Sequence, residues 1–334
     1  MEIRTVDPAD QALVREFWEV GRVADEHERQ WSTYWAWETA LVYLTTPNQW
    51  RELHLLGAFE SGRMIGALEC SLPVRDNTSS AGFDLYVDPA HRRRGVGTAL
   101  VEQLMPDLAE RDRRVVMVEV NTPIAGAPSA GMGFAERHGF APALVQEHRV
   151  LDLPATEGRW PGLAAEVAPA HADYELVTWF DTVPDEFLEG YCALQHAFND
   201  EAPSGELEIE AEHWDEQRVR GKEERFRRAG RHEVCTVAVA PDGAVVGLTE
   251  MIVSDHEPDR AMQCGTLVLP GHRGHRLGLA LKVANQTSLR DRFPAVRGVH
   301  AWNADVNEHM NAINARLGFT TVERLVEVQR EVTS

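Results

Sequence analysis

The sequence predicts an α/β (α+β) protein made of two tandem halves, each a mixed, mostly antiparallel twisted sheet flanked by helices. Three observations carry this prediction. Short apolar strands alternate with stretches of helical periodicity. Ser61-Gly62 and Asp242-Gly243 have the composition of hairpin turns. One stretch, 87–100, returns as 268–281 at a constant offset of 181 residues (268 minus 87). Such a repeat indicates duplication.

The two copies of the repeat read VDPAHRRRGVGTAL and VLPGHRGHRLGLAL. They share the valine, the proline, a His-Arg pair, the second glycine and the closing Ala-Leu. The same offset also superimposes Gly62 on Gly243, Gly66 on Gly247 and Glu69 on Glu250, so one register holds from the hairpin turn through the repeat. Each half therefore reads strand, helix, helix, hairpin, strand, helix, strand, helix, strand.

In the first half, a strand at 2–6 precedes Asp7-Pro8, a helix-start signal. Apolar periodicity and turn residues place the other elements. The expected helices are 9–24, 31–44, 96–108 and a short one that ends at His138-Gly139-Phe140. The expected strands are 53–60, 64–72, 83–87, 115–120 and 145–151.

Residues 154–173 are rich in Ala, Pro and Gly, which predicts a linker between domains at 1–153 and 174–334. The second half then repeats the order of the first. Its expected elements are a strand at 174–179, helices at 186–198 and 208–229 around a turn at 200–205, strands at 234–240 and 245–253, a helix at 306–317 and a strand at 321–332.

The composition is that of an ordinary globular protein, with 43% hydrophobic and 26% charged residues in a chain of 334. No apolar run approaches a membrane span, and the first residues lack a signal-peptide region, so we expect a cytoplasmic protein that binds no membrane. A net charge of −20 disfavours nucleic acid and favours a cationic or amine partner. Four cysteines without paired spacing predict neither disulfides nor zinc. Either a monomer or a homodimer fits.

The first copy of the repeat has the features of an anion site. An apolar strand leads into the basic, Gly-rich loop from Arg92 to Gly97, and a helix follows. Glycines let backbone N–H groups approach a ligand, a helix N-terminus presents unpaired donors, and arginines suit phosphate oxygens. The spacing fits neither the nucleotide P-loop nor the dinucleotide fingerprint, so ATP and NAD are not favoured. The alternative, a solvated basic turn, is weakened by the second copy.

The segment VDPAHRRRGVGTALVEQL, with Arg92-x-x-Gly95-x-Gly97 at its centre, resembles the acyl-CoA-binding motif of the GNAT N-acetyltransferase superfamily. The order of elements agrees over nearly all of both halves. The chain thus resembles a tandem GNAT protein of the actinobacterial type, and the resemblance implies two tandem GNAT-like domains.

The resemblance also implies an acyl-CoA, most simply acetyl-CoA, whose pyrophosphate binds the loop and whose pantetheine pairs with a strand that parts from its neighbour. An amine of a small molecule then attacks the acyl group directly. The implied CoA-binding residues are Leu85, Tyr86, Val87, Arg92, Arg93, Arg94, Gly95, Val96, Gly97 and Thr98 in the first half, and Leu267, Val268, Arg273, Gly274, His275, Arg276, Leu277, Gly278 and Asn307 in the second.

Each half departs from the family pattern. In the second loop, Arg276 replaces the first motif glycine. The family commonly has an Asn eleven positions and a Tyr four positions before a Gly-Phe pair. The second half has Asn307 and Asn314 there, and the first has Pro128 and Ala135. Neither half has the Tyr that would protonate the thiolate, so water or another side chain would have to serve as the acid. The first half has the better phosphate loop and the second the better pantetheine-contacting segment, so the catalytic half stays open.

Attack on an acyl group requires a neutral amine, and a carboxylate can serve as the base. The repeated carboxylates Glu250 and Glu69 are the candidates, with Glu250 favoured, and Asp84 competes where the second half has Gly265. A place on the solvated face of the sheet is the alternative for each. His272 and His275 lack accompanying carboxylate or thiol ligands, so no metal is expected.

The expected function is thus N-acyl transfer from acetyl-CoA to a primary amine. A noncatalytic acyl-CoA-binding or scaffold protein is the alternative, and one degenerate half would leave one CoA per chain. The amine itself is not encoded in a motif. The aromatic stretch Trp31–Trp37 and the acidic stretch Asp200–Glu212 are candidates for acceptor contacts; core packing is the alternative for the first and plain solvation for the second.

Overall fold

The computed structural model describes residues 1–201 and 203–332, and the chain divides into two compact units. Unit 1 takes in Met1–Val145, Gly205–Glu210 and the C-terminal residues from Leu325, and unit 2 takes in Gln146–Ser204 and Ala211–Arg324. The repeated order of strands and helices expected from the sequence is present in full.

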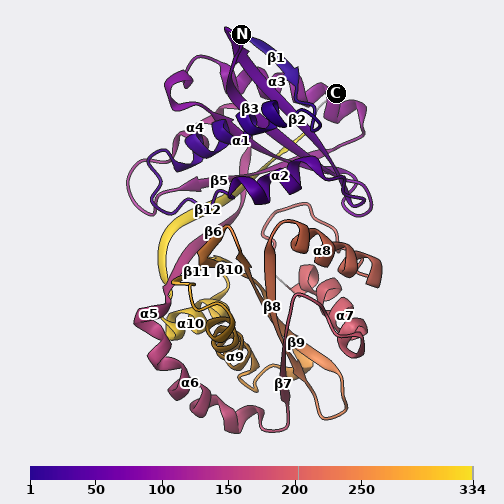
Figure 1. Ribbon diagram of the computed structural model, residues 1–334, viewed down its shortest axis with the longest axis vertical. Coiled ribbons are helices and arrows are strands. Elements are labelled where there is room, and N and C mark those ends of the chain that lie inside the picture. Colours follow the sequence, from indigo (N-terminus) through magenta and orange to yellow (C-terminus); the bar gives the residue numbers. More distant parts are fainter. Residues whose placement is uncertain (202, 333–334) are drawn as a thin grey trace. The chain divides into compact units, whose positions relative to one another are not determined.

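Unit 1 holds the elements of the first half (Figure 1). Its helices are α1 (Gln11–Glu26), α2 (Trp37–Thr45), α3 (Val96–Glu110) and α4 (Ala130–Arg137). Its strands are β1 (Glu2–Thr5), β2 (Arg51–Glu60), β3 (Arg63–Pro73), β4 (Ser80–Val87), β5 (Val115–Thr122) and the first part of β6 (Ala141–Asp152).

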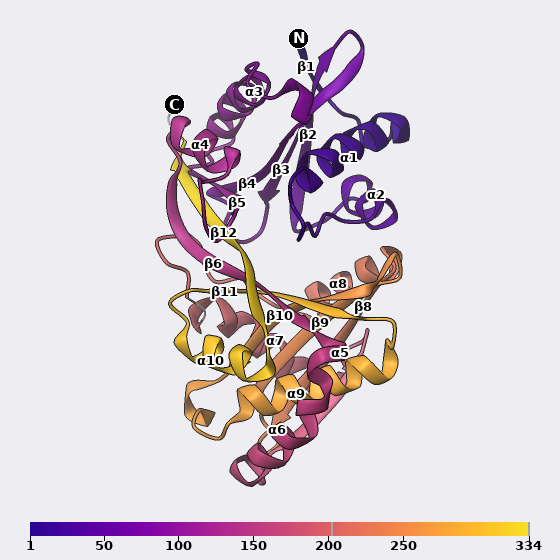
Figure 2. The same ribbon diagram turned by 90° about the vertical axis from the view of Figure 1, so that its left-hand side faces the viewer.

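The sheet of unit 1 runs β1-β2-β3-β4-β5 and continues with β12 (Thr320–Glu331) and β6. The first four strands pair antiparallel, and β4 pairs parallel to β5. Figure 2 shows α1 and α2 on one face of this sheet and α3 and α4 on the other. Side chains along the strands point alternately to the two faces of the sheet and contribute to two cores. One core lies under α3 and includes Leu68 and Leu100, and the other lies under α1 and includes Phe17 and Leu55.

The last strand of each half crosses the boundary between the units. Residues 146–152 of β6 pair antiparallel with β11 (Gly298–Ala304) in unit 2. The C-terminal part of β12 lies beside β5 in unit 1, where the Val332 amide donates to Arg114 O and where Val326 and Val328 join the core under α3. The structure therefore exchanges the strands at 145–151 and 321–332, which the sequence pattern assigns to their own halves.

Unit 2 repeats the arrangement. Its remaining strands are β7 (Glu175–Phe180), β8 (Arg231–Val239), β9 (Val245–Ser254) and β10 (Glu257–Val268), and β10 pairs parallel to β11. Its helices are α5 (Leu153–Thr156), α6 (Trp160–Val167), α7 (Asp185–Glu201), α8 (Glu216–Arg228), α9 (Leu277–Arg292) and α10 (Glu308–Leu317). Figure 1 shows α9 and α10 on one face of the sheet and α7 and α8 on the other.

Several element boundaries differ from the expected ones. Residues 31–36 are not helical; the Ser32 hydroxyl bonds Asp25, and the Tyr34 amide bonds Ser32, so local side-chain contacts compete with a helix. Helix α8 begins only at Glu216, because Asp215 caps it. The residues expected as a linker form α5 and α6 and bury Trp160 in the core of unit 2. Helix α7 runs into the expected turn at 200–205, where Ala202 lies outside the described residues. The domain boundaries at 153 and 174 stay a prediction.

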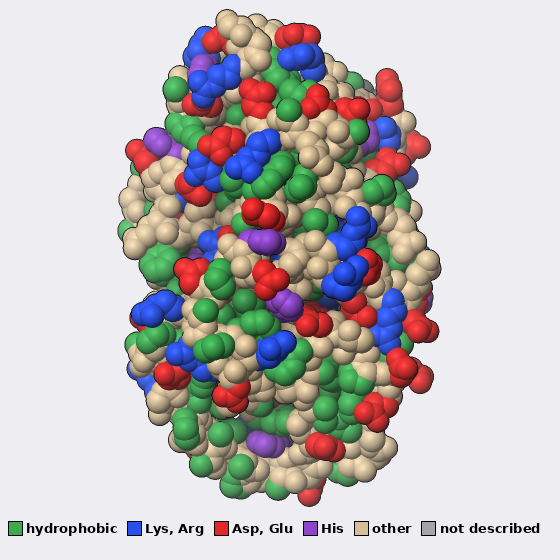
Figure 3. Space-filling model, viewed as in Figure 1, with side chains coloured by type: hydrophobic (Ala, Val, Ile, Leu, Met, Phe, Trp, Pro, Cys, Tyr) green, Lys and Arg blue, Asp and Glu red, His purple; other side chains and the backbone are tan. Residues whose placement is uncertain are grey.

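The part of the chain that the structure describes has no helix that is long and apolar enough to cross a membrane. Figure 3 shows acidic and basic side chains interspersed on the face in view. The four cysteines are free thiols, of which Cys70 and Cys235 are buried.

Candidate functional site

Two parallel strands part in the middle of each unit. In unit 1 the pairing of β4 with β5 ends at Gly82 and Met117, although β4 continues to Val87 and β5 to Thr122. In unit 2 the pairing of β10 with β11 ends at Gln263 and Ala301, and both strands again continue. Strands that part turn unpaired backbone N–H and C=O groups toward one another. Both units thus contain the parted strands that the resemblance implies.

A loop of the same backbone shape follows the parted strand in each unit. Two of its positions have left-handed φ angles: Arg93 (64°) and Gly95 (83°) in unit 1, and Gly274 (88°) and Arg276 (54°) in unit 2. Positions 93 and 274 correspond at the offset of 181, as do 95 and 276. Each loop therefore fills one left-handed position with glycine and the other with arginine, which bears a strain of about 1 kcal/mol. Arg276 leaves the shape of the second loop intact.

Arg92 and Arg273, the arginine shared by both copies, hold their loops in place. The Arg92 guanidinium donates to Val87 O (3.2 Å) and to Ala24 O at the end of α1 (2.9 Å). Arg273 donates to the corresponding Val268 O (3.1 Å) and to the Glu201 carboxylate at the end of α7 (2.5 Å). Both side chains are thus engaged with the protein and position the backbone of the loop.

The remaining basic side chains differ between the loops. Arg93 is exposed and has no polar partner among the described residues, and Arg94 pairs with Glu60 (2.7 Å). In unit 2, Gly274 stands in place of Arg93. His275 contacts Ala170 O (3.2 Å), and Arg276 pairs with Glu166 (2.7 Å). Among the described residues, the loop of unit 1 therefore has an exposed cationic side chain, Arg93, that is not engaged by another polar group.

Both loops lead into a helix with an open N-terminus. Helix α3 begins after Gly95 and α9 after Arg276, and neither has a side-chain cap. The first intrahelical amides are those of Ala99, which donates to Gly95 O, and Ala280, which donates to Arg276 O. The backbone N–H groups of residues 96–98 in α3 and 277–279 in α9 precede these donors and remain available to an anion. The helix dipole also favours an anion at this end.

The other expected loop residues shape the helix starts. A Cβ at Gly97 would lie 3.1 Å from the Phe134 ring, and one at Gly278 would lie 3.0 Å from Ile313. These glycines therefore allow close packing of α4 and α10. Val96 and Leu277 are buried, and the Thr98 hydroxyl lies 3.1 Å from His138 Nε2.

The expected strand residues lie on the parted strands, and the expected asparagine caps a helix. In unit 1, Leu85 and Val87 pack against the core under α3. In unit 2, Leu267 and Val268 join the cores. Asn307 caps α10 by accepting from the Met310 amide (3.1 Å). Asn314, at the position of the family's Tyr, is buried and accepts from Lys282 Nζ (3.1 Å).

Glu69 and Asp84 form a pair of carboxyls in unit 1. They are register partners on β3 and β4. Their neighbours Leu68, Cys70 and Phe83 lie in the core under α3, so the two carboxyls point to the other face of the sheet, which carries α1 and α2. Burial raises the pKa of Glu69 to about 7, and Asp84 adds to the shift. The Asp84 side chain is exposed to solvent in part. Desolvation by the surrounding protein, together with the charge of Asp25, raises its pKa to about 6.

Glu119 extends this pair across the parted strands. It lies two residues beyond Met117, as Asp84 lies two residues beyond Gly82, so the two side chains flank the opening on one face. Desolvation raises the pKa of Glu119 to about 7, with Glu327 on β12 adding to the shift. Side chains of like charge on neighbouring strands destabilise a sheet. An arrangement of this kind favours a positively charged ligand.

Aromatic rings lie beside these carboxyls. Tyr86, two residues beyond Asp84 on β4, contacts Tyr34 edge to face at 5.4 Å. Burial raises the pKa of both phenols above the ordinary range, and the charges of Glu69 and Asp84 contribute. Tyr34 and Trp37 also pack against the core under α1, as in the core-packing alternative, and a role of the stretch 31–37 in acceptor contacts stays a prediction.

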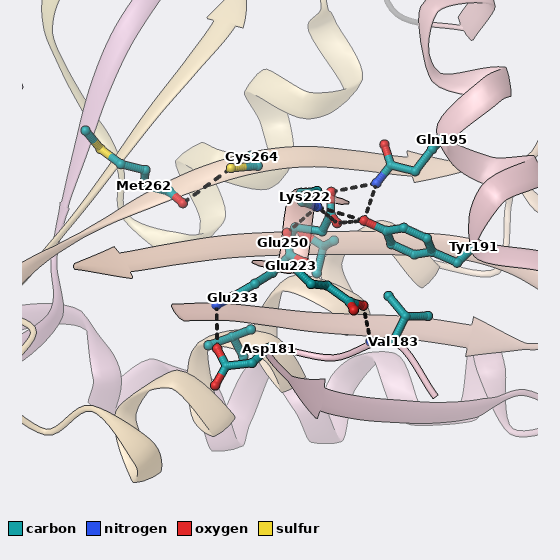
Figure 4. A network of polar contacts seen from close by, with 12 residues as sticks. Asp181, Val183, Tyr191, Gln195, Lys222, Glu223, Glu233, Glu250, Met262 and Cys264 are labelled. Atoms are coloured by element: carbon teal, nitrogen blue, oxygen red, sulfur yellow. Dashed lines mark hydrogen bonds and ion pairs between the residues drawn. The ribbon is translucent and has the colours of Figure 1, made fainter. Parts of the chain in front are cut away.

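Glu250, at the position that corresponds to Glu69, has a different environment in unit 2 (Figure 4). Its side chain is buried, and it accepts hydrogen bonds from the Tyr191 hydroxyl (2.6 Å), from Gln195 Nε2 (2.9 Å) and from Lys222 Nζ (3.3 Å). Burial alone would raise the pKa of Glu250, but Lys222 and these hydrogen bonds outweigh it and lower the pKa. A carboxylate held in this way is a poor base.

Lys222 joins Glu250 to a second carboxyl. Its Nζ lies 2.5 Å from Glu233 on β8. Burial would lower the pKa of Lys222, but the charges of Glu233 and Glu250 raise it, so the lysine stays charged. Burial raises the pKa of Glu233 to about 7. Lys222 and Glu250 are therefore both ionised at neutral pH.

A bulge in β10 and the ring of Phe198 are two further features that distinguish unit 2 from unit 1. The pairing of β10 with β9 shifts register between Gln263 and Thr266, so Cys264 and Gly265 have no register partner there. Gly265 stands where unit 1 has Asp84. A Cβ at Gly265 would lie 2.8 Å from the Phe198 ring of α7, so this ring takes the place of the carboxyl.

No group of three or more His, Cys, Asp or Glu residues in the described ranges is arranged to hold a metal ion. His272 Nδ1 lies 3.0 Å from the Tyr174 hydroxyl.

The sequence reasoning missed Lys222, Glu233, Tyr191 and Glu119. Two features of the sequence could have indicated Lys222 and Glu119. Lys222 is one of two lysines in the chain, and Glu119 interrupts the apolar strand VVMVEV.

Comparisons with known proteins agree with this geometry. Residues 16–140 match the family model of the acetyltransferase (GNAT) family. The chain is 28% identical over 251 residues to a mycothiol acetyltransferase of Saccharomonospora viridis, covering 73% of this chain and 72% of that protein.

Two solved structures share the architecture. A tandem GNAT protein from the clavulanic acid biosynthesis pathway has a TM-score of 0.83 and 28% identity, covering 100% of this chain and 99% of that one. A GCN5-related N-acetyltransferase from Sphaerobacter thermophilus shares the fold, with a TM-score of 0.65 and 17% identity over 100% of this chain and 96% of that one. The resemblance seen in the repeat is confirmed: residues 16–140 match the acetyltransferase (GNAT) family, and the chain is similar over its whole length to a tandem GNAT protein.

Proposed function

We propose that the protein transfers an acetyl group from acetyl-CoA to a primary amine of a small molecule, and that unit 1 carries out the transfer. The observation that carries the proposal is the combination found in unit 1 alone. There the parted strands and the anion loop lie beside a carboxyl pair, Glu69 and Asp84, that forms no salt bridge with the described residues. The charge of Arg51 lowers the pKa of Glu69 less than burial and Asp84 raise it.

The loop of unit 1 fits the pyrophosphate of the acyl donor. The open amides at the start of α3 and the exposed Arg93 supply donors, while Arg92 holds the backbone in place. The edge of β4 beyond Gly82 has backbone groups that suit the pantetheine amides. The thioester supplies an activated acyl group, which an amine attacks without a covalent enzyme intermediate.

The carboxyl pair prepares the amine. A free amine is mostly protonated at pH 7, and a base with a pKa near 7 removes that proton most effectively. Glu69, with a pKa of about 7, and Asp84, with a pKa of about 6, meet this requirement. Ala135 occupies the position of the family's Tyr, so either water or another side chain returns the proton to the departing thiolate.

Release of free thiol from acetyl-CoA, with a panel of primary amines, tests this function. We expect thiol release that depends on the amine, with kcat/KM rising between pH 6 and pH 8 as the carboxyls lose their protons. Binding of acetyl-CoA without thiol release from any amine would contradict transfer and favour the noncatalytic acyl-CoA-binding alternative.

A further inference from the structure

We propose that unit 2 contains a binding site for a primary alkylammonium ion and that Lys222 of the same chain fills it. The site consists of Glu250, Glu233 and Tyr191 around the Lys222 ammonium (Figure 4), with the rings of Phe226 and Trp214 nearby. An external amine is thereby kept from the place in unit 2 that corresponds to Glu69 in unit 1. The proposal needs no acyl transfer, so its test is independent of the function proposed above.

The contacts of Lys222 match the three N–H donors of an ammonium group. Its Nζ lies 2.5 Å from Glu233 Oε1, 2.8 Å from the Tyr191 hydroxyl and 3.3 Å from Glu250 Oε1. The Tyr191 hydroxyl accepts from Lys222 and donates to Glu250 (2.6 Å), and Gln195 donates to both Tyr191 and Glu250 at 2.9 Å. Two of the three acceptors, Tyr191 and Glu250, are therefore oriented by further hydrogen bonds.

Aromatic rings surround the same ammonium. Lys222 Nζ lies 5.5 Å from the ring centres of Tyr191 and Phe226 and 6.0 Å from that of Trp214. The rings of Phe226 and Trp214 can attract a cation through their negative faces at such distances, whereas Tyr191 contacts the ammonium through its hydroxyl. Two carboxyls, a phenol oxygen and two rings form the kind of site that recognises an alkylammonium ion.

The number and positions of the lysines in this chain also support the proposed ammonium site. The chain has only two lysines, Lys222 and Lys282, among 33 basic residues, so the first 221 residues contain none. Unit 1 thus has no lysine of its own beside Glu69. Lysine also suits three separate acceptors as a compact charge, whereas the planar fork of arginine suits paired ones.

The Lys222 side chain connects the site to solvent. It is 19% exposed, while the side chains of Glu233 and Glu250 are 4% and 6% exposed. Removing the lysine stem would therefore open the carboxyls to a small amine of the same length.

The experiment uses Lys222→Ala in the full chain without CoA. This change removes three methylene carbons and the ammonium, and n-propylammonium has that size. We expect the melting temperature of Lys222→Ala to fall by about 5–10 °C, because removal of one partner leaves buried charge unpaired. Addition of n-propylammonium chloride should restore at least half of this loss and shift the wild type by less than about 1 °C. Equal shifts of variant and wild type, or equal recovery with n-propanol, would overturn the proposal.

Lys282→Ala is the matched control. Lys282 is buried, donates to Asn314 Oδ1 (3.1 Å), lies 5.6 Å from the Phe319 ring, and pairs with no carboxylate in the described part of the chain. Its loss should lower stability without selective recovery by n-propylammonium. Recovery of both variants alike would mean that the amine fills any lysine cavity, and the site would not be specific.

A measurement on the wild type covers the case in which Lys222→Ala does not fold. Protein labelled with [15N]lysine has signals from two side chains only. We expect the Lys222 ammonium protons to exchange with water more than tenfold more slowly than those of free lysine at the same pH. Exchange at the rate of free lysine would contradict the proposal.

Discussion

Glu69 and Glu250 occupy the same position in the two halves but have opposite environments. Glu69 faces Asp84, a second carboxyl, and its pKa is raised to about 7. Glu250 faces Lys222, Tyr191 and Gln195, and its pKa is lowered. Asp84 is replaced by Gly265, over which the Phe198 ring lies.

The two units are alike in the backbone features that surround the repeated carboxyl. The parted strands, the loop with two left-handed residues and the uncapped helix are present in both units. The side chains that face the repeated carboxyl differ. Glu69 in unit 1 therefore faces a second carboxyl, and unit 2 pairs the corresponding carboxyl internally. Similar folds can support different chemistry because function depends on the local site, and the proposed function assigns the amine site to unit 1 on this difference.

The largest expected difference lies in the rate of acyl transfer. Glu69→Gln removes the proposed base and should lower kcat/KM about 10²–10⁴-fold, the usual contribution of general base catalysis. Glu250→Gln, measured below its own melting temperature, should change kcat/KM less than about threefold. Steady-state thiol release checks both. A larger loss from Glu250→Gln than from Glu69→Gln would move the catalytic site to unit 2.

Stability should respond in the opposite order. Glu250→Gln leaves Lys222 with one carboxyl fewer in a buried site and should lower the free energy of unfolding by about 3 kcal/mol at pH 7. Because the pKa of Glu250 is lowered in the folded state, its contribution is present above its ordinary value and disappears as the pH falls through the folded pKa. Thermal unfolding between pH 3 and pH 8 checks this. A cost that is independent of pH would contradict the ion pair.

Glu69→Gln should have a smaller effect of the opposite sign. The folded-state pKa of Glu69, about 7, lies above its ordinary value of 4.5, so the wild type loses stability as the pH rises through that interval. The amide does not titrate. We therefore expect Glu69→Gln to be more stable than the wild type by about 1 kcal/mol at pH 8, with no difference below pH 4. Destabilisation at pH 8 would show that Glu69 is paired.

The smallest expected effect concerns the loop. Arg93 is exposed without a polar partner among the described residues, and Arg94 pairs with Glu60. Arg93→Ala should weaken acetyl-CoA binding about fivefold, or about 1 kcal/mol, as expected for one exposed charge-assisted hydrogen bond. Arg94→Ala is the control and should weaken it less. Calorimetric titration compares them, and equal losses would assign both side chains to the pyrophosphate.

The fold was largely predictable from local pattern. Hairpin turns, the two loops and the order of elements are short-range features, and the structure has them where the repeat places them. The exchange of β6 and β12 was not predictable, because both strands have similar alternating apolar residues and either could pair with β5 or β11. The helix expected at 31–44 starts only at Trp37, because Ser32 forms contacts that its sequence neighbours do not reveal.

The candidate site was predictable only in part. Glycine and arginine spacing marked the loops, since backbone shape depends on the local residues. The roles of Glu69 and Glu250 depended on side chains far away in the sequence. Lys222, 28 residues before Glu250 along the chain, decides the charge state of that carboxylate. The repeated spacing does not distinguish the two glutamates, and the preference for Glu250 in the sequence analysis took no account of its pairing with Lys222.

Direct titration of the two carboxyls tests the central claim, that the repeated glutamate is open in unit 1 and satisfied in unit 2. Protein with 13C-labelled glutamate carboxyls, assigned by comparison with Glu69→Gln and Glu250→Gln, reports each pKa by NMR. We expect Glu69 to titrate near pH 7 and Glu250 to remain ionised below pH 4.5. Titration of Glu250 near pH 7, with Glu69 near 4.5, would contradict it.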